Sequence, residues 1–476
     1  MLFDREKELE ELNFVLEEPG THFLTMSGRR RLGKTTLLVE WARRSGKSSI
    51  YWVASRVSGI QLLRSFSQAV YHHAHPDIPA DPDFTYPTWE MALHQVAELA
   101  RDQRLIVILD EFPYAAEVES ALPSILQNAW DHFLKQTLVF LVLCGSHIGM
   151  MEKLHAHQAP LFGRITGNLY LGAMPFSATV HFLPAYPLDR RVAVYAMLGG
   201  VPAYLERFSD RLSLADNVRR HLFRPTGMFR TDPQYLLHDE VQQPHNYLAV
   251  LLAIAAGNHV QGDIIRATGI QHITSYLKRL QDLGFIQREV PATVPEAKRV
   301  GSHQGRYDLA DPYLRFYYRF IHPNQHLLEQ GLYDWLWTLI SEQLASYVGT
   351  YAFEGLCREW VLVKARAKEL PFIPERVGSH WSPVAQIDIV AINWRQKNIL
   401  LGEAKWSKDR VSRSVVRELV GKTPSVIPDD GEGWTVHYAL FARSGFTEAA
   451  VTEAQRYSAL LVDLETLGAD LAASSR

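Results

Sequence analysis

Between residues 28 and 35 the chain reads Gly28-Arg29-Arg30-Arg31-Leu32-Gly33-Lys34-Thr35, that is, glycine, four residues and then Gly-Lys-Thr. The mostly apolar run His22–Met26 precedes it and predicts a strand, whereas Thr36 and the residues after it favour a helix. Glycines let main-chain N–H groups approach phosphate oxygens, and the N-terminus of a helix attracts anions. We therefore expect Gly28–Thr36 to bind the phosphates of a nucleotide.

Two further residues of this pattern have specific expected roles. Lys34 should reach the β- and γ-phosphates, and the hydroxyl of Thr35 should bind Mg²⁺. A continuous apolar run, Leu105–Leu109, predicts a strand that is buried on both faces, and it ends in Asp110 and Glu111. Acidic residues at the carboxyl end of a parallel strand face the ligand crevice. We expect Asp110 to hold the Mg²⁺ and Glu111 to polarise the attacking water, with ATP and Mg²⁺ as the cofactors.

A third apolar strand, Leu138–Leu143, is followed by Cys144, Gly145 and Ser146. Taken alone, a serine after a glycine is more often a turn residue than a functional one.

Several segments together resemble the archaeal-type ATPase family, in the signal-transduction (STAND) branch of the AAA+-like P-loop ATPases. They are Phe3–Leu9, the phosphate-binding pattern, Asp110-Glu111, Gly145-Ser146, Phe162-Gly163-Arg164 and Gly199–Leu205. The resemblance implies that Phe3 and Arg5 lie against the base, that Pro202 contacts adenine and that Ser146 senses the γ-phosphate. It makes Arg164 a candidate arginine finger, and the alternative for Arg164 is a surface salt bridge.

The middle of the chain has the pattern of a helix-turn-helix followed by a two-stranded wing. The expected helices are Tyr247–Ala256, Val260–Thr268 and Ile273–Leu280, and the polar wing is Pro295–Gly305 between strands that end at Glu289 and begin at Arg306. If this module reads DNA, the third helix presents Thr274, Ser275, Lys278 and Arg279 to the major groove. The pattern equally fits a module that only packs against protein.

The C-terminal region contains two apolar strands that carry charged residues. Asp388 lies in Ala385–Ile392, and Glu403 and Lys405 lie in Ile399–Trp406. Neighbouring strands would bring Asp388 and Glu403 onto one Mg²⁺, with Lys405 on the same face as Glu403. The pattern resembles the PD-(D/E)xK restriction-endonuclease fold, in which Glu354 matches the helix carboxylate. It also resembles the C-terminal domain of unknown function that often follows this ATPase.

The name-giving proline of that fold is replaced by Ile387. Both a catalytic site made of Glu354, Asp388, Glu403 and Lys405 and a non-catalytic scaffold with internal ion pairs remain open.

The composition of the chain limits the class of protein to which it can belong. The chain has 476 residues, 47% hydrophobic, two cysteines and a formal net charge of −3. It contains no run near the roughly 20 apolar residues of a membrane helix, and its first residues are charged where a signal peptide needs an apolar run. We expect a cytoplasmic protein without membrane contact, whose DNA binding depends on local basic patches.

We therefore expect an α/β protein in five parts: a P-loop ATPase domain with a parallel sheet (1–175), a helical lid (176–244), a winged helix (245–322), a helical connector (323–348) and a restriction-endonuclease-like α/β domain (349–476). The expected function is ATP hydrolysis that gates a DNA-acting, metal-dependent nuclease. The alternative is a non-cleaving ATP switch or regulator. Two binding partners remain open, namely double-stranded DNA and further copies of the same chain.

Overall fold

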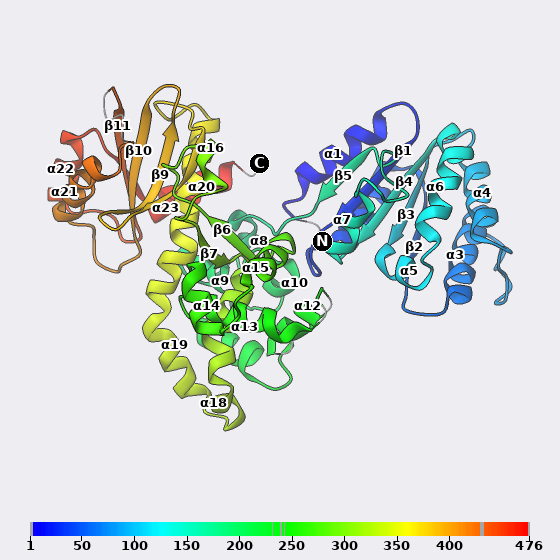
Figure 1. Cartoon of the computed structure of the whole chain (residues 1–476), viewed down its shortest axis with the longest axis horizontal. Coiled ribbons are helices and arrows are strands. Elements are labelled where there is room, and N and C mark those ends of the chain that lie inside the picture. Colours follow the sequence, from blue (N-terminus) through cyan, green and yellow to red (C-terminus); the bar gives the residue numbers. More distant parts are fainter. Residues whose placement is uncertain (1–2, 231, 239, 242, 429–432, 475–476) are drawn as a thin grey trace. The chain divides into compact units, whose positions relative to one another are not determined.

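The computed structural model describes residues 3–230, 232–238, 240–241, 243–428 and 433–474 (Figure 1). These residues form two compact units. The first extends to Met174 and includes Val201–Ala203, and the second comprises Pro175–Gly200 and the chain from Tyr204 onward. Within the described residues, none of the helices combines the length and apolarity that crossing a membrane requires.

The first unit is a five-stranded parallel sheet with helices on both faces, in the order β2-β3-β4-β1-β5. Its strands are β1 (His22–Ser27), β2 (Ser48–Val53), β3 (Leu105–Asp110), β4 (Val139–Gly145) and β5 (Gly167–Tyr170). Its helices are α1 (Glu6–Glu17), α2 (Lys34–Ser45), α3 (Gly59–Ala74), α4 (Trp89–Leu99), α5 (Phe112–Val118), α6 (Leu122–His132) and α7 (Ile148–Leu154). The parallel sheet of the expected α/β class is therefore present.

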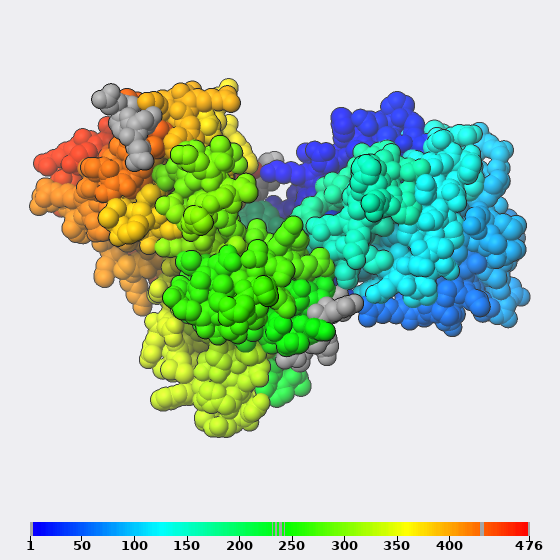
Figure 2. Space-filling view, viewed as in Figure 1, coloured from blue at the N-terminus to red at the C-terminus, as the bar shows by residue number. Residues whose placement is uncertain are grey.

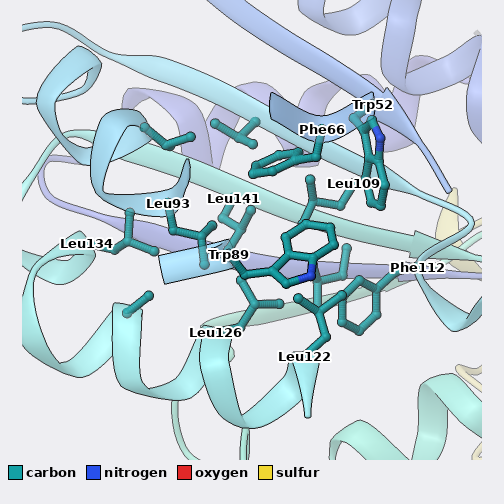
Figure 3. Close-up of a cluster of buried hydrophobic side chains, with 14 of the residues drawn as sticks. Trp52, Phe66, Trp89, Leu93, Leu109, Phe112, Leu122, Leu126, Leu134 and Leu141 are labelled. Atoms are coloured by element: carbon teal, nitrogen blue, oxygen red, sulfur yellow. The ribbon is translucent and has the colours of Figure 1, made fainter. Parts of the chain in front are cut away.

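The main core of this unit lies between the sheet and helices α3 to α6 (Figure 3). Trp52 of β2, Phe66 of α3 and Trp89 of α4 pack together, with ring centroids 5.3 to 5.9 Å apart. On the opposite face, Trp41 of α2 packs on Phe140 of β4. β3 and β4 are buried along their whole length because both faces of the sheet are covered.

The second unit begins with a mostly helical part. Its helices are α8 (Thr179–Phe182), α9 (Leu188–Leu198), α10 (Pro202–Leu205), α11 (Leu214–Val218), α12 (Asp232–His238), α13 (Pro244–Ala255), α14 (Gln261–Thr268), α15 (Ile273–Asp282), α16 (Glu296–Arg299), α17 (Pro312–Phe316), α18 (Gln325–Glu329) and α19 (Tyr333–Val348). The first residues of α10 cluster with the first unit. Strands β6 (Ile286–Glu289) and β7 (Arg306–Leu309) form an antiparallel pair. Helices α13 to α15 and this pair occupy the positions that the helix-turn-helix pattern predicts.

The second unit ends in a separate mixed sheet of order β12-β11-β10-β9-β8. Its strands are β8 (Arg376–Trp381), β9 (Gln386–Asn393), β10 (Asn398–Lys405), β11 (Thr435–Ala442) and β12 (Leu460–Asp463), and its helices are α20 (Glu354–Arg366), α21 (Arg413–Gly421), α22 (Glu448–Arg456) and α23 (Leu464–Ala473). Helices α21 and α22 cover one face through an apolar cluster, and Trp360 of α20 packs on Phe441 of β11. β9 and β10 are antiparallel neighbours, as the expected site requires.

Candidate functional site

The loop between β1 and α2 curls tightly because glycine occupies its two critical positions. Gly33 has φ +88°, which is a left-handed conformation, and it is the residue before helix α2. Gly28 has φ +156°, and a Cβ there would lie 2.5 Å from the carbonyl oxygen of Leu171. A larger residue at position 28 would therefore push β5 away from the loop.

Lys34 is the first residue of α2 and is buried. Its ammonium group donates hydrogen bonds to the carbonyl oxygens of Gly28 (2.8 Å) and Arg29 (3.0 Å), so it lies inside the curl of the loop. Burial lowers the pKa of Lys34, against the opposing charges of Glu111 and Asp110. A buried cation inside the curl of a glycine-containing loop suits the negatively charged phosphates of a nucleotide.

Thr35 and Asp110 meet at the end of this loop. The Thr35 hydroxyl donates to Oδ2 of Asp110 at 2.6 Å, and the Glu111 N–H donates to Oδ1 at 2.9 Å. A hydroxyl beside a carboxylate is a hard-oxygen pair of the kind that Mg²⁺ takes. The structure thus brings together the two residues that the sequence assigns to Mg²⁺.

Tyr51 is a neighbour that the sequence does not indicate. Its hydroxyl donates to Oδ2 of Asp110 at 2.8 Å. Burial, followed by the charge of Asp110, raises the pKa of Tyr51. Tyr51 lies on β2 opposite Ile108, two residues before the end of β3, so only the pairing of β2 with β3 places it at this carboxylate.

Glu111 and Ser146 form a second pair beside the loop. Glu111 has φ +50°, which turns the chain sharply after β3. The Ser146 hydroxyl contacts both carboxylate oxygens of Glu111, at 3.0 and 2.9 Å. The pair forms because β4 lies between β1 and β3, so its carboxyl end faces both the loop and the acidic pair.

The residues assigned to the loop flank and the base occupy different places in the first unit. Arg5 is buried and donates to the carbonyl oxygens of Leu32 (3.0 Å) and Gly172 (2.9 Å), so it supports the loop from behind. Phe3 is half-buried, and so is Pro202 at the start of α10. Base contact by Phe3, Arg5 and Pro202 stays a prediction.

The remaining residues of the phosphate-binding loop differ in their contacts, backbone conformation and exposure. Arg30 donates to the hydroxyl of Tyr114, Leu32 is buried, and Arg31 has φ +71°. Thr36 is exposed on the first turn of α2.

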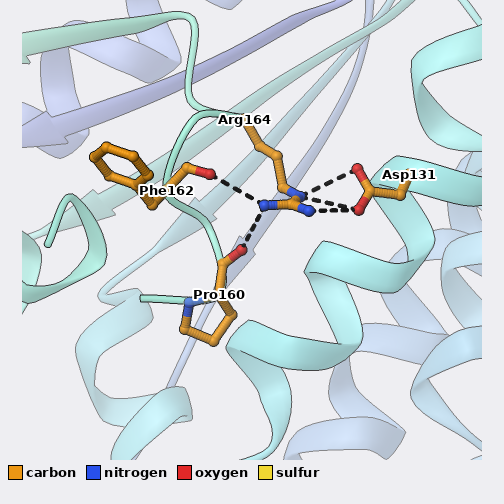
Figure 4. A network of polar contacts seen from close by, with 4 residues as sticks. All are labelled: Asp131, Pro160, Phe162 and Arg164. Carbon is orange, nitrogen blue, oxygen red and sulfur yellow. Dashed lines mark hydrogen bonds and ion pairs between the residues drawn. The ribbon is translucent and has the colours of Figure 1, made fainter. Parts of the chain in front are cut away.

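Arg164 is held by Asp131 of α6 (Figure 4). Its Nε and Nη2 atoms donate to the carboxylate at 2.7 to 3.1 Å, and Nη1 donates to the carbonyl oxygens of Pro160 and Phe162. Hydrogen bonding to Arg164 lowers the pKa of Asp131. This is the ion pair that the sequence left as the alternative, and a role as an arginine finger would require Arg164 to leave Asp131.

The four charged residues of the C-terminal region converge from three elements. Glu354 begins α20, Asp388 lies on β9, and Glu403 and Lys405 lie on β10. Oδ2 of Asp388 accepts a hydrogen bond from the N–H of Ala404, next to Glu403. The ammonium group of Lys405 lies 2.6 Å from Oε1 of Glu403.

These carboxylates repel one another. Burial and then the charge of Asp388 raise the pKa of Glu354 to about 8, and burial and then Glu403 raise the pKa of Asp388 to about 6. Glu403 is buried, and its Oε2 has no hydrogen-bond partner within the described part of the chain, although Lys422 lies 3.6 Å away. The repulsion in such a cluster is relieved either by protonation of a carboxylate or by added positive charge. Even so, among the described residues no three His, Cys, Asp or Glu side chains are arranged to hold a metal ion.

The helix expected to read DNA presents part of its predicted face. Thr274, Ser275 and Lys278 of α15 are exposed. Arg279 is half-buried and donates to the carbonyl oxygen of Glu240 at 3.4 Å.

Known proteins match both ends of the chain. The family described as "ATPase domain predominantly from Archaea" matches residues 2–208, and the one described as "Archaea bacterial proteins of unknown function" matches residues 317–417. The uncharacterized protein MJECL04 of Methanocaldococcus jannaschii is 31% identical over 98% of this chain and 99% of its own length.

Solved structures also match this chain. The Walker-type ATPase PABY2304 of Pyrococcus abyssi is 19% identical, with a TM-score of 0.51 over 67% of this chain and 96% of its own. The ORC2 protein of Aeropyrum pernix is 17% identical, with a TM-score of 0.41 over 70% and 95%. The P-loop geometry, the family match and the full-length relative lead to one conclusion: the chain belongs to the archaeal-type P-loop ATPase family.

Proposed function

We propose that this ATPase is a cytoplasmic switch that uses ATP binding and hydrolysis to control a metal-dependent nuclease domain acting on DNA. The observation that carries the proposal is the convergence of Glu354, Asp388 and Glu403, with Lys405 beside them. Mutual repulsion among buried carboxylates is costly unless one of them is protonated or a cation offsets it, and such groups are common at catalytic sites.

In the first unit, Thr35 and Asp110 would hold Mg²⁺, and Lys34 would bind the β- and γ-phosphates. Glu111 would orient the attacking water, and its contact with Ser146 supports this role because it links the carboxylate to a residue expected to sense the γ-phosphate. Mg²⁺ supplies positive charge to the phosphates during hydrolysis.

In the second unit, the residues present fit a divalent cation. Asp388 and Glu403 offer hard oxygen donors, and among the described residues Oε2 of Glu403 accepts no hydrogen bond, with the ammonium group of Lys422 3.6 Å away. Mg²⁺ usually keeps several waters and takes only one or two carboxylates, so it does not require a third protein ligand. Lys405 would orient the water or phosphate, and the metal would supply charge to the scissile phosphate.

One observation favours the alternative, a non-cleaving switch. The ion pair of Lys405 with Glu403, together with the nearby Lys422, partly neutralises the cluster without a metal.

Cleavage of plasmid DNA separates the two functions. Wild type, Asp388→Ala and Glu111→Gln are incubated with Mg²⁺ or Mn²⁺, with and without ATP. We expect wild type to cleave, Asp388→Ala to hydrolyse ATP without cleaving, and Glu111→Gln to alter the ATP dependence of cleavage. Absence of cleavage by wild type under every metal and nucleotide condition would leave the non-cleaving switch.

A further inference from the structure

Within the second unit, the segment after β6 is docked along β8, the edge strand of the C-terminal sheet. The N–H of Ala292 donates to the carbonyl oxygen of Ser379 at 2.8 Å, and the hydroxyl of Thr293 lies 2.7 Å from Nδ1 of His380. Trp381 donates from its indole N–H to the carbonyl oxygen of Gln304 at 3.0 Å. These contacts join the segment between β6 and β7, which includes the predicted wing, to the C-terminal sheet, and Figure 1 shows α16 of this segment beside that sheet.

Two cavities lie along this junction. One, of about 190 Å³, is lined by Glu354 and Asp388 on one side and by Glu289 and Arg306 on the other. The other, of about 360 Å³, is lined by four arginines: Arg288, Arg299, Arg358 and Arg376. Glu289, Arg358 and Ser379 line both, so the two cavities are adjacent. We call the second cavity the arginine groove; its lining residues belong to chain segments that are coloured green to yellow in Figure 2.

Three of the four guanidinium groups are held by main-chain carbonyl oxygens. Arg288 donates to Ser302 at 2.6 Å, and Arg299 donates to Pro291 at 2.9 Å and to Val290 at 3.0 Å. Arg358 donates to the carbonyl oxygen of Asp388 at 3.2 Å. A carbonyl oxygen orients a guanidinium group but carries no full charge, so the positive charge is kept.

The fourth arginine is paired with a carboxylate that would compete only weakly with a bound anion. Arg376 pairs with Glu296 of α16, whose side chain is 78% exposed and therefore contributes little. Glu289 and Glu359 also line the groove, which leaves two more guanidinium groups than carboxylates in its wall. Burial and the charges of Arg376 and Arg288 lower the pKa of Arg299, so the arginines act on one another at close range.

We infer that the arginine groove binds a backbone phosphate of a nucleic-acid strand and leads that strand to the carboxylates of Glu354 and Asp388. The inference rests on the proposed function. Guanidinium groups preset by carbonyl oxygens match the oxygens of a phosphate, and a phosphodiester brings the negative charge that the groove lacks. A strand held there lies beside the carboxylate cavity because Arg358 borders both cavities.

The test is equilibrium binding of fluorescent DNA oligonucleotides, single-stranded and duplex, to the full chain in EDTA, followed by anisotropy across a range of salt concentrations. Arg376→Gln and Glu296→Gln form a matched pair, because each removes the same ion pair. We expect Arg376→Gln to weaken binding about tenfold and to lower the slope of log affinity against log salt by about one. Glu296→Gln should bind DNA as tightly as wild type or more tightly, because it removes a competing carboxylate.

The inference is overturned if Arg376→Gln and Glu296→Gln change binding alike, or if neither changes it while Lys278→Gln abolishes it. A second variant, Arg299→Lys, keeps the charge but loses the paired donors, and it should bind more weakly than wild type. Because it also loses the hydrogen bonds to Pro291 and Val290, binding is compared at a temperature at which both proteins are fully folded. Pyrophosphate serves as the small-anion probe. Binding of pyrophosphate that requires Arg376, without binding of DNA, would overturn the assignment to a nucleic acid.

Cleavage assays with the same variants keep the two proposals apart. If wild type binds DNA through Arg376 but never cleaves it, the groove stands and the nuclease proposal falls. If wild type cleaves and Arg376→Gln binds and cleaves equally well, the nuclease stands and the groove falls.

Discussion

Glu354→Gln provides a quantitative test of the carboxylate cluster. In the folded chain, burial and Asp388 raise the pKa of Glu354 from 4.5 to about 8. Between these values the folded state keeps a proton that the unfolded chain has released, so the free energy of unfolding falls as pH rises. At about 1.36 kcal/mol per pH unit, the loss amounts to roughly 5 kcal/mol by pH 8.

Glutamine has nearly the shape of protonated glutamate and does not ionise. Glu354→Gln should therefore be about as stable as wild type near pH 5 and more stable by several kcal/mol near pH 9. Mg²⁺ should stabilise wild type at alkaline pH more than it stabilises the variant, because a cation offsets the ionised cluster.

Scanning calorimetry in EDTA across this pH range measures the effect. The first unit is identified by the transition that ATP shifts upward, and the other transition is followed. Glu448→Gln, which removes an exposed carboxylate at the start of α22, is the control and should leave the pH profile unchanged. Parallel profiles for wild type and Glu354→Gln would refute a protonated, buried Glu354.

Three predictions concern the first unit. Lys34→Ala should abolish ATP binding, whereas Glu111→Gln should bind ATP without hydrolysing it. Equilibrium binding measures the affinity for ATP, and phosphate release measures turnover. Turnover at the wild-type rate in either variant would contradict the assignment of these two residues. Gly28→Ala should lower the melting temperature and weaken ATP binding, because the added Cβ would lie 2.5 Å from a carbonyl oxygen. Such a clash costs about 1–3 kcal/mol of stability. An unchanged melting curve would show that the loop shifts to accommodate the Cβ. Arg164→Ala and Asp131→Ala each break the same ion pair, which is worth about 1 kcal/mol or less of stability. Lower ATP turnover in Arg164→Ala alone would reveal an arginine finger. Equal turnover in the two variants would show that the ion pair is only structural.

The nucleotide site could be predicted in large part from the sequence because its signals are local. Gly28–Thr35 are consecutive, and the strand before them and the helix after them follow from short-range patterns. Asp110 could be placed because the carboxyl end of a fully apolar, buried strand is where a parallel sheet presents its ligand-binding side chains. The charged strands β9 and β10 were likewise recognisable, since buried strands rarely carry isolated carboxylates.

Other features depended on which segments pack together. Tyr51 reaches Asp110 only because β2 pairs with β3, and the ion pair of Arg164 with Asp131 joins a loop to α6. The arginine groove draws its side chains from β6, α16, α20 and β8, and none of these segments has a basic run that would announce it. Periodicity and spacing show how a residue relates to its neighbours in the sequence. Strand order, and the docking of the segment after β6 on an edge strand, are instead set by contacts between residues far apart in the chain. A single sequence encodes no local pattern for such contacts.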